Sequence, residues 1–587
     1  MDELDRESTR ITSNGKGLII LLATLQGFLL YLLHYFIKHD YPLLQHDAWR
    51  VLCYSIILTA PLVIMLSIRH AKDKWPWIFA AALALLVGLT AFYTGYQCND
   101  SVNIRCGESI FVPFTLSQTV ALFIALFFFQ TWLSSGNFSF PYSRLFNFSW
   151  FNFLTLALTV LFCLIFWSLL WLWAALFKLV GIYFFNELFF KTLWFEYIAG
   201  GFVFGIGIVI FRNEINFVYA VRKILRVLIW ALLPLLAFIA ILFLIVLPFT
   251  GIKPLWDTRH ASFLMMWLMT LVLFFTNAVY QDGSGGRVYH RYAAIFIQAA
   301  LVLIPVYVLL SAYSLYLRIQ QHGWTHDRLW AVVILIFLSG YVFLYAWSVI
   351  KKRANWITLF RPVNTVMAVI IFLVCIITQT PLLDFRKITV HNQVSRLNAG
   401  EVDAKKFDYN YLRFDLGNPG YRALLALAEN PLVIKAGMRP HIAELIARNN
   451  PSNRHILPEI GIANINLVPN DLVPPSRLLD LIYKDDISRR QCGGKISTCY
   501  LFSLDLNGDG AAEYVLLFAQ YRRGWGFMYE FTGQTWEKTA NINSPYISGN
   551  TLDEKQLKSG NIQAMDPVWK QLQIGKAVMN VLPFKGR

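Results

Sequence analysis

The string DLNGDGAAE near the carboxyl end of this 587-residue chain carries the residue types best suited to holding a metal ion. Asp505, Asn507 and Asp509 alternate along it, so their side-chain oxygens fall at every second position. Gly510 permits a sharp bend, and Glu513 supplies a further carboxylate. Oxygen ligands with this spacing can wrap around one hard cation, and calcium accepts such a set in a flexible geometry. The string therefore predicts one structural calcium ion, with an ordinary metal-free turn as the alternative.

The loop departs from the complete EF-hand pattern at one position. Its twelfth residue is Leu516, where that pattern requires a bidentate Glu. The loop instead resembles the calcium-binding hairpins of the FG-GAP and related β-repeat families. Because it lies between two predicted strands, we expect a bound ion to tie those strands together, with the carbonyl of Ala511 as a ligand beside the side chains.

Two pairs of cysteines are close together in the sequence. Cys98 and Cys106 lie in a loop between hydrophobic segments, and Cys492 and Cys499 lie in the carboxyl-terminal part. A zinc site is the alternative to disulfides, but neither pair has the CxxC spacing of zinc-binding motifs. We expect two intrachain disulfides, each restraining the unfolded chain by about 2 to 3 kcal/mol in the entropic model. Disulfides persist in oxidising compartments, so both pairs should lie outside the cytoplasm.

The segment RIQQHGWTHDRLW contains a second group of residues that could bind a ligand. The ring of Trp324 suits the membrane headgroup layer, and the guanidinium of Arg328 suits a phosphate or an acidic partner. We therefore expect these two residues to form a functional loop outside the membrane. His322 and His326 would share one face of a helix and could bind a metal, but Gly323 between them argues against a helix there.

No motif of an established catalytic class occurs in the sequence. A nucleophile elbow, a phosphate-binding glycine loop, HExxH and CxxC are all missing. One alternative is an enzyme at the outer leaflet acting on a lipid-linked substrate, with Asp40 or Asp47 as the acid. A transporter is the other, with Glu187 and Glu196 as ion-coupling groups. However, Glu187 can pair with Lys191 one helical turn away, as in an amphipathic segment at the membrane interface.

Composition indicates that a membrane positions these residues. Hydrophobic residues make up 57% of the chain and charged residues 15%, whereas soluble domains have roughly 45 to 50% apolar residues. Asn277, Asn364 and other uncharged polar residues within the hydrophobic runs can bond between helices. Runs long enough to cross a bilayer of about 30 Å are found near 17–36, 51–68, 75–96, 110–133, 150–177, 194–211, 227–249, 263–280, 293–316, 329–349 and 363–383.

The basic residues between these runs predict the orientation of the chain. With the amino terminus inside, the inner segments contain seventeen Lys and Arg and the outer ones nine, as the positive-inside rule requires. Eleven crossings then place residues 384–587 outside the cytoplasm. Because about half of the basic residues lie beside hydrophobic runs, the net charge of +16 is explained without nucleic acid, and we expect no nucleic-acid partner.

The carboxyl-terminal part has the composition of a soluble domain. Residues 384–587 carry twenty Asp and Glu, against fifteen in residues 1–383. Residues 392–449 alternate polar and apolar residues at helical spacing, and residues 460–545 contain short runs typical of strands. The predicted fold is a polytopic α-helical membrane bundle of about eleven transmembrane helices, residues 1–383, followed by an α+β domain.

Several strings of the chain together resemble a known bacterial family. They include LLATLQGFLLYLLH, NAVYQDG, the segment LRIQQHGWTHDRLWA, and DFRKITVHNQVSRLNAGEVDAKKFDYNYLRFDLG. Over most of residues 17–430 the chain resembles the membrane family named domain of unknown function 4153. The resemblance implies a multi-pass protein of a bacterial inner membrane, with a cytoplasmic amino terminus and a periplasmic carboxyl-terminal domain on the orientation above. It implies no catalytic residue.

Together these features favour a non-enzymatic envelope protein. The bundle would anchor an outer domain that acts as a scaffold or a sensor, in contact with the lipid bilayer and with another envelope protein or a lipid. The enzyme and the transporter are the alternative functions.

Overall fold

The computed structural model describes residues 11–98, 108–251, 261–281, 288–447, 464–469, 471–493, 498–520, 523–533, 535–543, 562, 572–574 and 577–579. Within these ranges, eleven helical segments are long and apolar enough to cross a membrane, and they coincide with the eleven hydrophobic runs of the sequence. The predicted fold class is confirmed. The chain divides into two compact units, Met1–Pro451 and Ser452–Arg587. The helical region after the last span therefore belongs to the first unit, a division that differs from the predicted one at residue 384.

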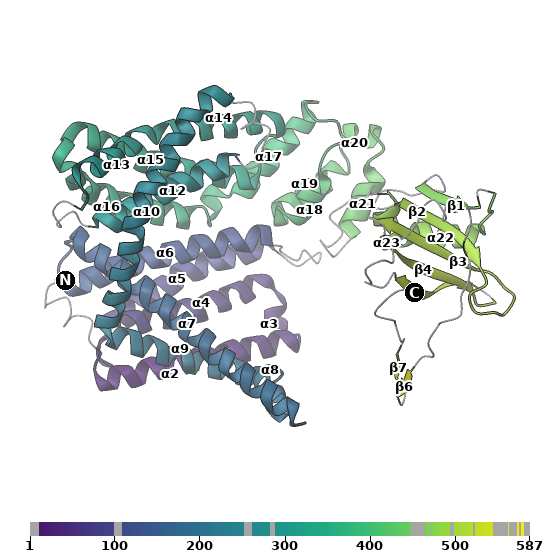
Figure 1. The fold of residues 1–587 in the computed structure, drawn as a ribbon, viewed down its shortest axis with the longest axis horizontal. Coiled ribbons are helices and arrows are strands. Elements are labelled where there is room, and N and C mark those ends of the chain that lie inside the picture. The colour runs from purple at the N-terminus through teal and green to yellow at the C-terminus, as the bar shows by residue number, and fades with distance from the viewer. Residues whose placement is uncertain are drawn as a thin grey trace. The chain divides into compact units, whose positions relative to one another are not determined.

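The amino-terminal helices form one lobe of the bundle (Figure 1). Its apolar core joins five helices through buried side chains such as Ile19, Met65 and Ile208. The elements of this lobe are α2 (Ser13–Lys38), α3 (Pro42–Gln45), α4 (Asp47–Ser67), α5 (Trp75–Gln97), α6 (Glu108–Ser135), α7 (Tyr142–Leu179), α8 (Phe184–Phe190) and α9 (Leu193–Asn213).

Small residues let two helices of this lobe approach closely. On α2, Ala23 and Gly27 are four residues apart, and on α9 Gly201 and Gly205 have the same spacing. A Cβ on Gly201 would lie 2.4 Å from the carbonyl oxygen of Ala23, and one on Gly27 would lie 2.2 Å from that of Tyr197. Backbone contact of this kind is the usual way in which transmembrane helices associate, because burial in lipid supplies no hydrophobic drive between them.

A second lobe is built from the later spans (Figure 1). Asn277, Tyr345 and Asn364 connect three of its helices, since the Tyr345 hydroxyl lies 2.8 and 2.7 Å from the two amide oxygens. The predicted span 293–316 is two helices that meet at Ile304 and Pro305, because proline has no backbone N–H for the helical ladder. The elements are α10 (Ile215–Thr250), α12 (Ala261–Tyr280), α13 (Arg291–Leu303), α14 (Pro305–His322), α15 (His326–Lys352), η1 (Arg353–Leu359) and α16 (Phe360–Ile377).

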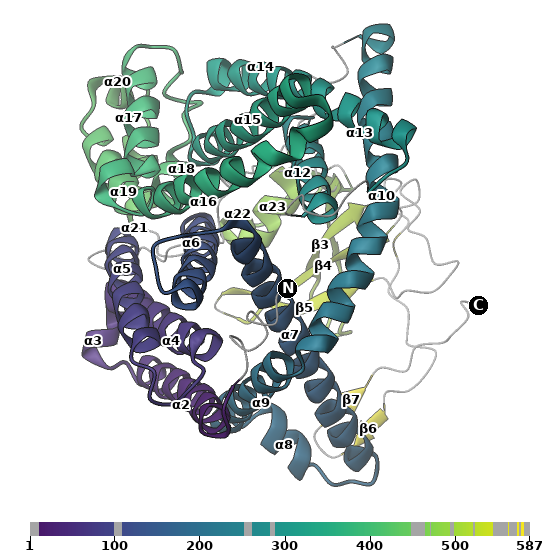
Figure 2. The ribbon, with the colours of Figure 1, turned by 90° about the vertical axis from the view of Figure 1, so that its left-hand side faces the viewer.

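The longest helices, α7 and α10, cross where the two lobes meet (Figure 2). Phe151 and Leu154 of α7 pack there against Val218 of α10. With 38 residues α7 is about 57 Å long, which exceeds a hydrocarbon core of about 30 Å. The short helix α8 packs back on the far end of α7 through Phe189, which lies against Leu170.

Five short helices follow the last span and form a helical subdomain with its own core. Leu412, Leu424 and Ile442 are fully buried in it. It begins after η2 (Pro381–Leu383) and consists of α17 (Phe385–Asn398), α18 (Tyr409–Phe414), α19 (Gly417–Leu427), α20 (Pro431–Lys435) and α21 (Arg439–Ala447). These helices occupy most of the described part of residues 392–449.

The second unit contains a five-stranded sheet in the order β1-β2-β3-β4-β5, in which β1 is parallel to β2 and the other pairs are antiparallel. Alternate side chains of β2 face opposite ways, as the pleat requires. Leu501 lies under Leu478 and Ile482 of a helix, whereas Tyr500 and Phe502 line the other face. The elements are β1 (Ile465–Val468), α22 (Ser476–Lys484), α23 (Asp486–Gly493), β2 (Thr498–Leu504), β3 (Glu513–Gln520), β4 (Arg523–Phe531), β5 (Trp536–Asn543), β6 (Leu572–Ile574) and β7 (Ala577–Met579).

Candidate functional site

The DLNGDGAAE string forms the hairpin loop between β2 and β3. The carboxylates of Asp505, Asp509 and Glu513 each offer an oxygen atom, and these atoms lie within 4.8 Å of one another. The two oxygens of Asp505 accept the backbone N–H groups of Gly508 at 2.7 Å and Gly510 at 3.1 Å. The sequence thus brings three of its predicted ligands together, because the turn wraps around the first carboxylate.

Glycine and asparagine give this loop its shape. Gly508 and Gly510 have φ angles of +77° and +83°, which other residues adopt only with strain. Asn507 donates to the Asp509 carboxylate at 3.0 Å and accepts the Asp509 backbone N–H at 2.9 Å. Glu513 is buried, and its carboxylate accepts the backbone N–H at residue 506 at 2.7 Å. The carboxylates therefore already hold the turn, and an ion would add to these bonds.

The carboxyl-terminal cysteine pair is joined. Cys492 and Cys499 form a disulfide with a Cα–Cα separation of 5.5 Å, which connects the end of α23 to the start of β2. Cys98 is also disulfide-bonded, but its predicted partner Cys106 lies outside the described residues.

The GWTHDR segment contains the connection between α14 and α15 and the first residues of α15. Helix α17 packs against this connection. Gly323 has a φ of +72° and ends α14, so the prediction that it interrupts a helix is confirmed. The backbone N–H of Trp324 donates to the side-chain oxygen of Asn392 at 2.8 Å. Gln393 donates to the carbonyls of His322 at 3.0 Å and Trp324 at 2.8 Å. The GWT and NQVSRLNAGEV strings, 68 residues apart, therefore hold each other in place.

His326 and Arg328 of the segment are engaged in the same junction. Nη1 of Arg328 donates to the carbonyl of Gly323 at 2.6 Å, so its guanidinium stabilises the conformation of the loop. The backbone N–H of His326 donates to the hydroxyl of Tyr411 at 3.0 Å, and burial raises the pKa of Tyr411 to about 12. His326 Nε2 accepts from Trp330 at 3.2 Å. In the described part of the chain these histidines belong to no metal-binding group.

A buried ion pair begins the helical subdomain. Asp384 and Arg386 are each 4% exposed, and Nε of Arg386 lies 2.8 Å from Oδ1 of Asp384. The other carboxylate oxygen accepts the hydroxyl of Tyr93 at 2.7 Å and Nη2 of Arg386 at 3.2 Å. Burial alone would raise the pKa of Asp384, but the charge of Arg386 and these hydrogen bonds outweigh it and hold the pKa below its ordinary value. No prediction from the sequence includes this pair. The available signal was an aspartate at a helix N-cap position, directly after the last apolar run.

The helical subdomain touches both lobes of the bundle. Tyr93, on α5, connects it to the first lobe, and Gln393, on α17, connects it to the loop of the second lobe. At Gly417 an added Cβ would lie 2.6 Å from the carbonyl of Gln97, so the start of α19 also lies directly against α5. The subdomain therefore spans the two lobes at one end of the bundle. A movement of one lobe relative to the other would strain or break these contacts.

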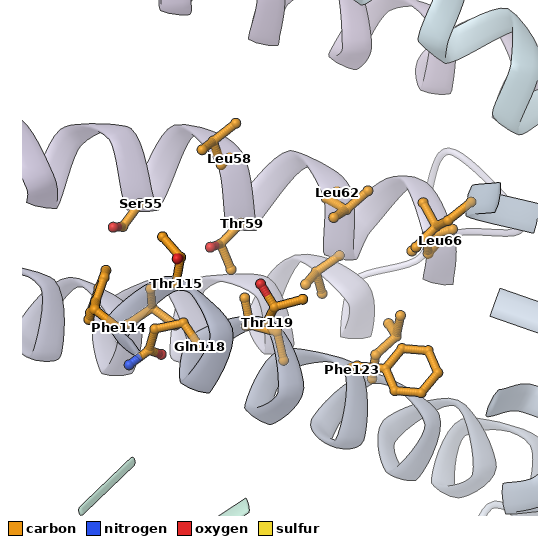
Figure 3. A pocket seen from close by; sticks show the side chains of 15 residues that line it. Ser55, Leu58, Thr59, Leu62, Leu66, Phe114, Thr115, Gln118, Thr119 and Phe123 are labelled. Carbon is orange, nitrogen blue, oxygen red and sulfur yellow. The ribbon is translucent and has the colours of Figure 1, made fainter. Parts of the chain in front are cut away.

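A groove of about 240 Å³ runs between α4 and α6 (Figure 3). Ser55, Thr59 and Gln118 give one end polar groups, and Leu66 and Phe123 make the other end apolar. The amide nitrogen of Gln118 donates to a threonine hydroxyl of α5 at 3.0 Å, whereas its oxygen has no partner in the described part of the chain. The groove can hold an apolar chain.

The carboxylates of the two alternative functions lie in a turn or in the first turns of helices, with Glu196 at the start of α9. Asp47 lies in the first turn of α4 and pairs with Arg50 at 3.1 Å, and Asp40 lies in the turn before α3. Glu187 pairs with Lys191 at 3.7 Å, as predicted, and both side chains are exposed. Among the described residues, none of these carboxylates belongs to a group that could hold a metal ion.

The fold and these sites define a polytopic helical membrane protein with a docked helical subdomain and a sheet domain. The family model described as Domain of unknown function (DUF4153) matches residues 56–427, well over half of the chain. The protein belongs to this family. The matched region includes both strings that meet at the junction of α17 with the α14–α15 loop. No curated protein and no solved structure matches the chain.

Proposed function

We propose that this protein is a non-enzymatic scaffold or sensor of the bacterial inner membrane, whose bundle couples an outer domain to an envelope partner. The observation that carries the proposal is the helical subdomain that spans both lobes through Asp384 and Gln393. Polar side chains there are used to join structural elements, which is typical of coupling and not of a site open to a substrate.

The orientation belongs to the same proposal. The amino terminus would be cytoplasmic and the residues after the last span periplasmic. The excess of basic residues in the inner segments supports this arrangement. The Cys492–Cys499 disulfide supports it independently, since such bonds persist outside the cytoplasm.

The proposal includes one structural calcium ion in the loop between β2 and β3. Three carboxylates within 4.8 Å repel one another, and a divalent ion would relieve that repulsion. Asp505, Asp509, Glu513 and Asn507 would supply side-chain oxygens and Ala511 its carbonyl. Magnesium would substitute poorly, because it requires a tighter octahedron and gives up its waters reluctantly.

Chemical cross-linking in intact cells tests the function. The full chain would be purified in mild detergent, and the cross-linked proteins and lipids identified. We expect one envelope partner to be enriched, and Asp384→Asn to reduce its recovery at equal expression, because that change weakens the junction. The same set recovered from wild type and variant would contradict coupling through this subdomain.

The alternatives have their own controls. Asp40→Asn combined with Asp47→Asn removes both acids of the enzyme hypothesis, and Glu187→Gln combined with Glu196→Gln removes the coupling groups of the transporter hypothesis. Each double variant should complement a deletion strain fully. If either double variant is expressed normally but fails to complement the deletion strain, that alternative is favoured over the scaffold.

A further inference from the structure

A small polar cavity lies where α4 and α9 end on the same side of the bundle. Arg212 and Ser67, each 3% exposed, line it together with the half-buried Arg69. Nη1 of Arg212 donates to the carbonyl of Met65 at 2.5 Å and so caps α4. In the described part of the chain, Nε of Arg212 and Oγ of Ser67 have no hydrogen-bond partner. Unpartnered buried polar groups are costly, so the cavity presents two donors that an occupant would satisfy.

The charge of this cavity is only partly compensated, because Asp73 attracts Arg69 whereas no carboxylate among the described residues acts on Arg212. Among the described residues, no carboxylate forms an ion pair with Arg69 or Arg212. Asp73 accepts the backbone N–H of Arg69 at 3.2 Å and that of the next residue at 2.8 Å, so its carboxylate serves the turn. Gln130, the other polar residue of the lining, exchanges hydrogen bonds with Asn152. Two neighbouring guanidinium groups at the edge of a bilayer therefore favour the binding of an anion.

The cavity adjoins the groove between α4 and α6. Leu66 lines both hollows. Along α4, the groove extends from Leu66 to Ser55, eleven residues or about 16 Å at the helical rise. This length is close to half of a hydrocarbon core of about 30 Å. The guanidinium groups thus lie at the depth of the headgroups and the groove at the depth of one leaflet.

We propose that the cavity and the groove together bind one anionic phospholipid. The cavity has room for a single oxygen-sized atom, which would be a phosphate oxygen that accepts from Arg212, Ser67 and Arg69. One acyl chain lies between α4 and α6, beginning at the apolar end beside Leu66. A zwitterionic lipid is disfavoured, because its amine would add a further positive charge beside the guanidinium groups.

Thermal unfolding of the delipidated full chain in neutral detergent tests this assignment. Phosphatidylglycerol should raise the melting temperature in a saturable manner, and more than phosphatidylcholine with the same acyl chains. Arg69→Gln should weaken the apparent affinity for phosphatidylglycerol by about tenfold, since it removes a charge-assisted hydrogen bond. Lys74→Gln makes the same change of charge away from the cavity and should leave the affinity within about twofold.

Ser67→Ala separates binding from folding. Because the hydroxyl is buried without a partner, its removal should leave the lipid-free melting temperature unchanged or higher, while it weakens lipid binding. Equal stabilisation by phosphatidylcholine, equal affinities of Arg69→Gln and Lys74→Gln, or full stabilisation by inorganic phosphate alone would each overturn the proposal. The last result would assign the cavity to a free phosphate ion.

Discussion

Replacing Asp384 by Asn should release the helical subdomain from the bundle. The carboxylate accepts four hydrogen bonds: Oδ1 those of the backbone N–H and Nε of Arg386, and Oδ2 those of the Tyr93 hydroxyl and Nη2 of Arg386. An Asn oxygen can keep the first two. Its NH2 group would face Nη2 of Arg386, which can only donate, and Arg386, whose side chain is 5% exposed, would remain charged without a counterion. Breaking a buried pair from one side costs about 3 to 5 kcal/mol.

Hydrogen exchange of the α17 amides in the full chain would measure this loss. A cost of about 3 kcal/mol corresponds to exchange that is faster by about one hundredfold, if α17 opens locally. Asp403→Asn, the same chemical change at an exposed position of the subdomain, should change the opening free energy by less than about 0.5 kcal/mol.

A second substitution tests whether the unpaired charge of Arg386 causes the loss. Arg386→Gln in the Asp384→Asn background removes the unpaired charge, so it should restore at least about half of the lost free energy. If the double variant exchanges as fast as the single one, the buried charge is not the cause. Wild-type exchange in Asp384→Asn would refute the role of the ion pair altogether.

The ion pair also predicts a dependence on pH. The pKa of Asp384 is lower in the folded chain than in the unfolded one, where it is about 4. Its contribution to stability is therefore complete above the unfolded pKa and is lost as the pH falls through the folded pKa. Protection of α17 should decline in this acidic range in the wild type, and less in Asp384→Asn.

Four further predictions concern other parts of the chain. A phosphatase fused to the carboxyl end should be active and a fluorescent protein there dark, whereas the reverse would place that end in the cytoplasm. Cys492 and Cys499 should resist alkylation until a reductant is added. Calcium, but not magnesium, should protect the β2–β3 loop from proteolysis in the full chain, and Asp505→Ala should abolish the effect, so equal cleavage in chelator would leave an ordinary turn. Gly201→Val should lower the melting temperature of the bundle, because its Cβ would lie 2.4 Å from the carbonyl of Ala23. Gly200→Val is the control, because an added Cβ there meets no atom closer than a Trp167 carbon at 3.9 Å.

The sequence by itself determined which segments cross the membrane. Apolar length is a local property, because a span must hide its own backbone from lipid, and all eleven runs coincide with helices of the structure. The β2–β3 loop was predictable for a similar reason. Its carboxylates and glycines are close together in the sequence, so the arrangement of the carboxylates in space follows from their spacing along the chain.

Only the tertiary structure decided which distant residues meet. Nothing local to Asn392 or Gln393 indicates that they hold the loop at Trp324, and the tie of Tyr93 to Asp384 joins residues 291 positions apart. Arg212 illustrates the same limit. In the sequence it is one more basic residue after a span, whereas in the structure it caps α4 and lies beside a second guanidinium group. Such sites depend on how helices pack, and packing follows from contacts between several faces at once, which no single segment encodes.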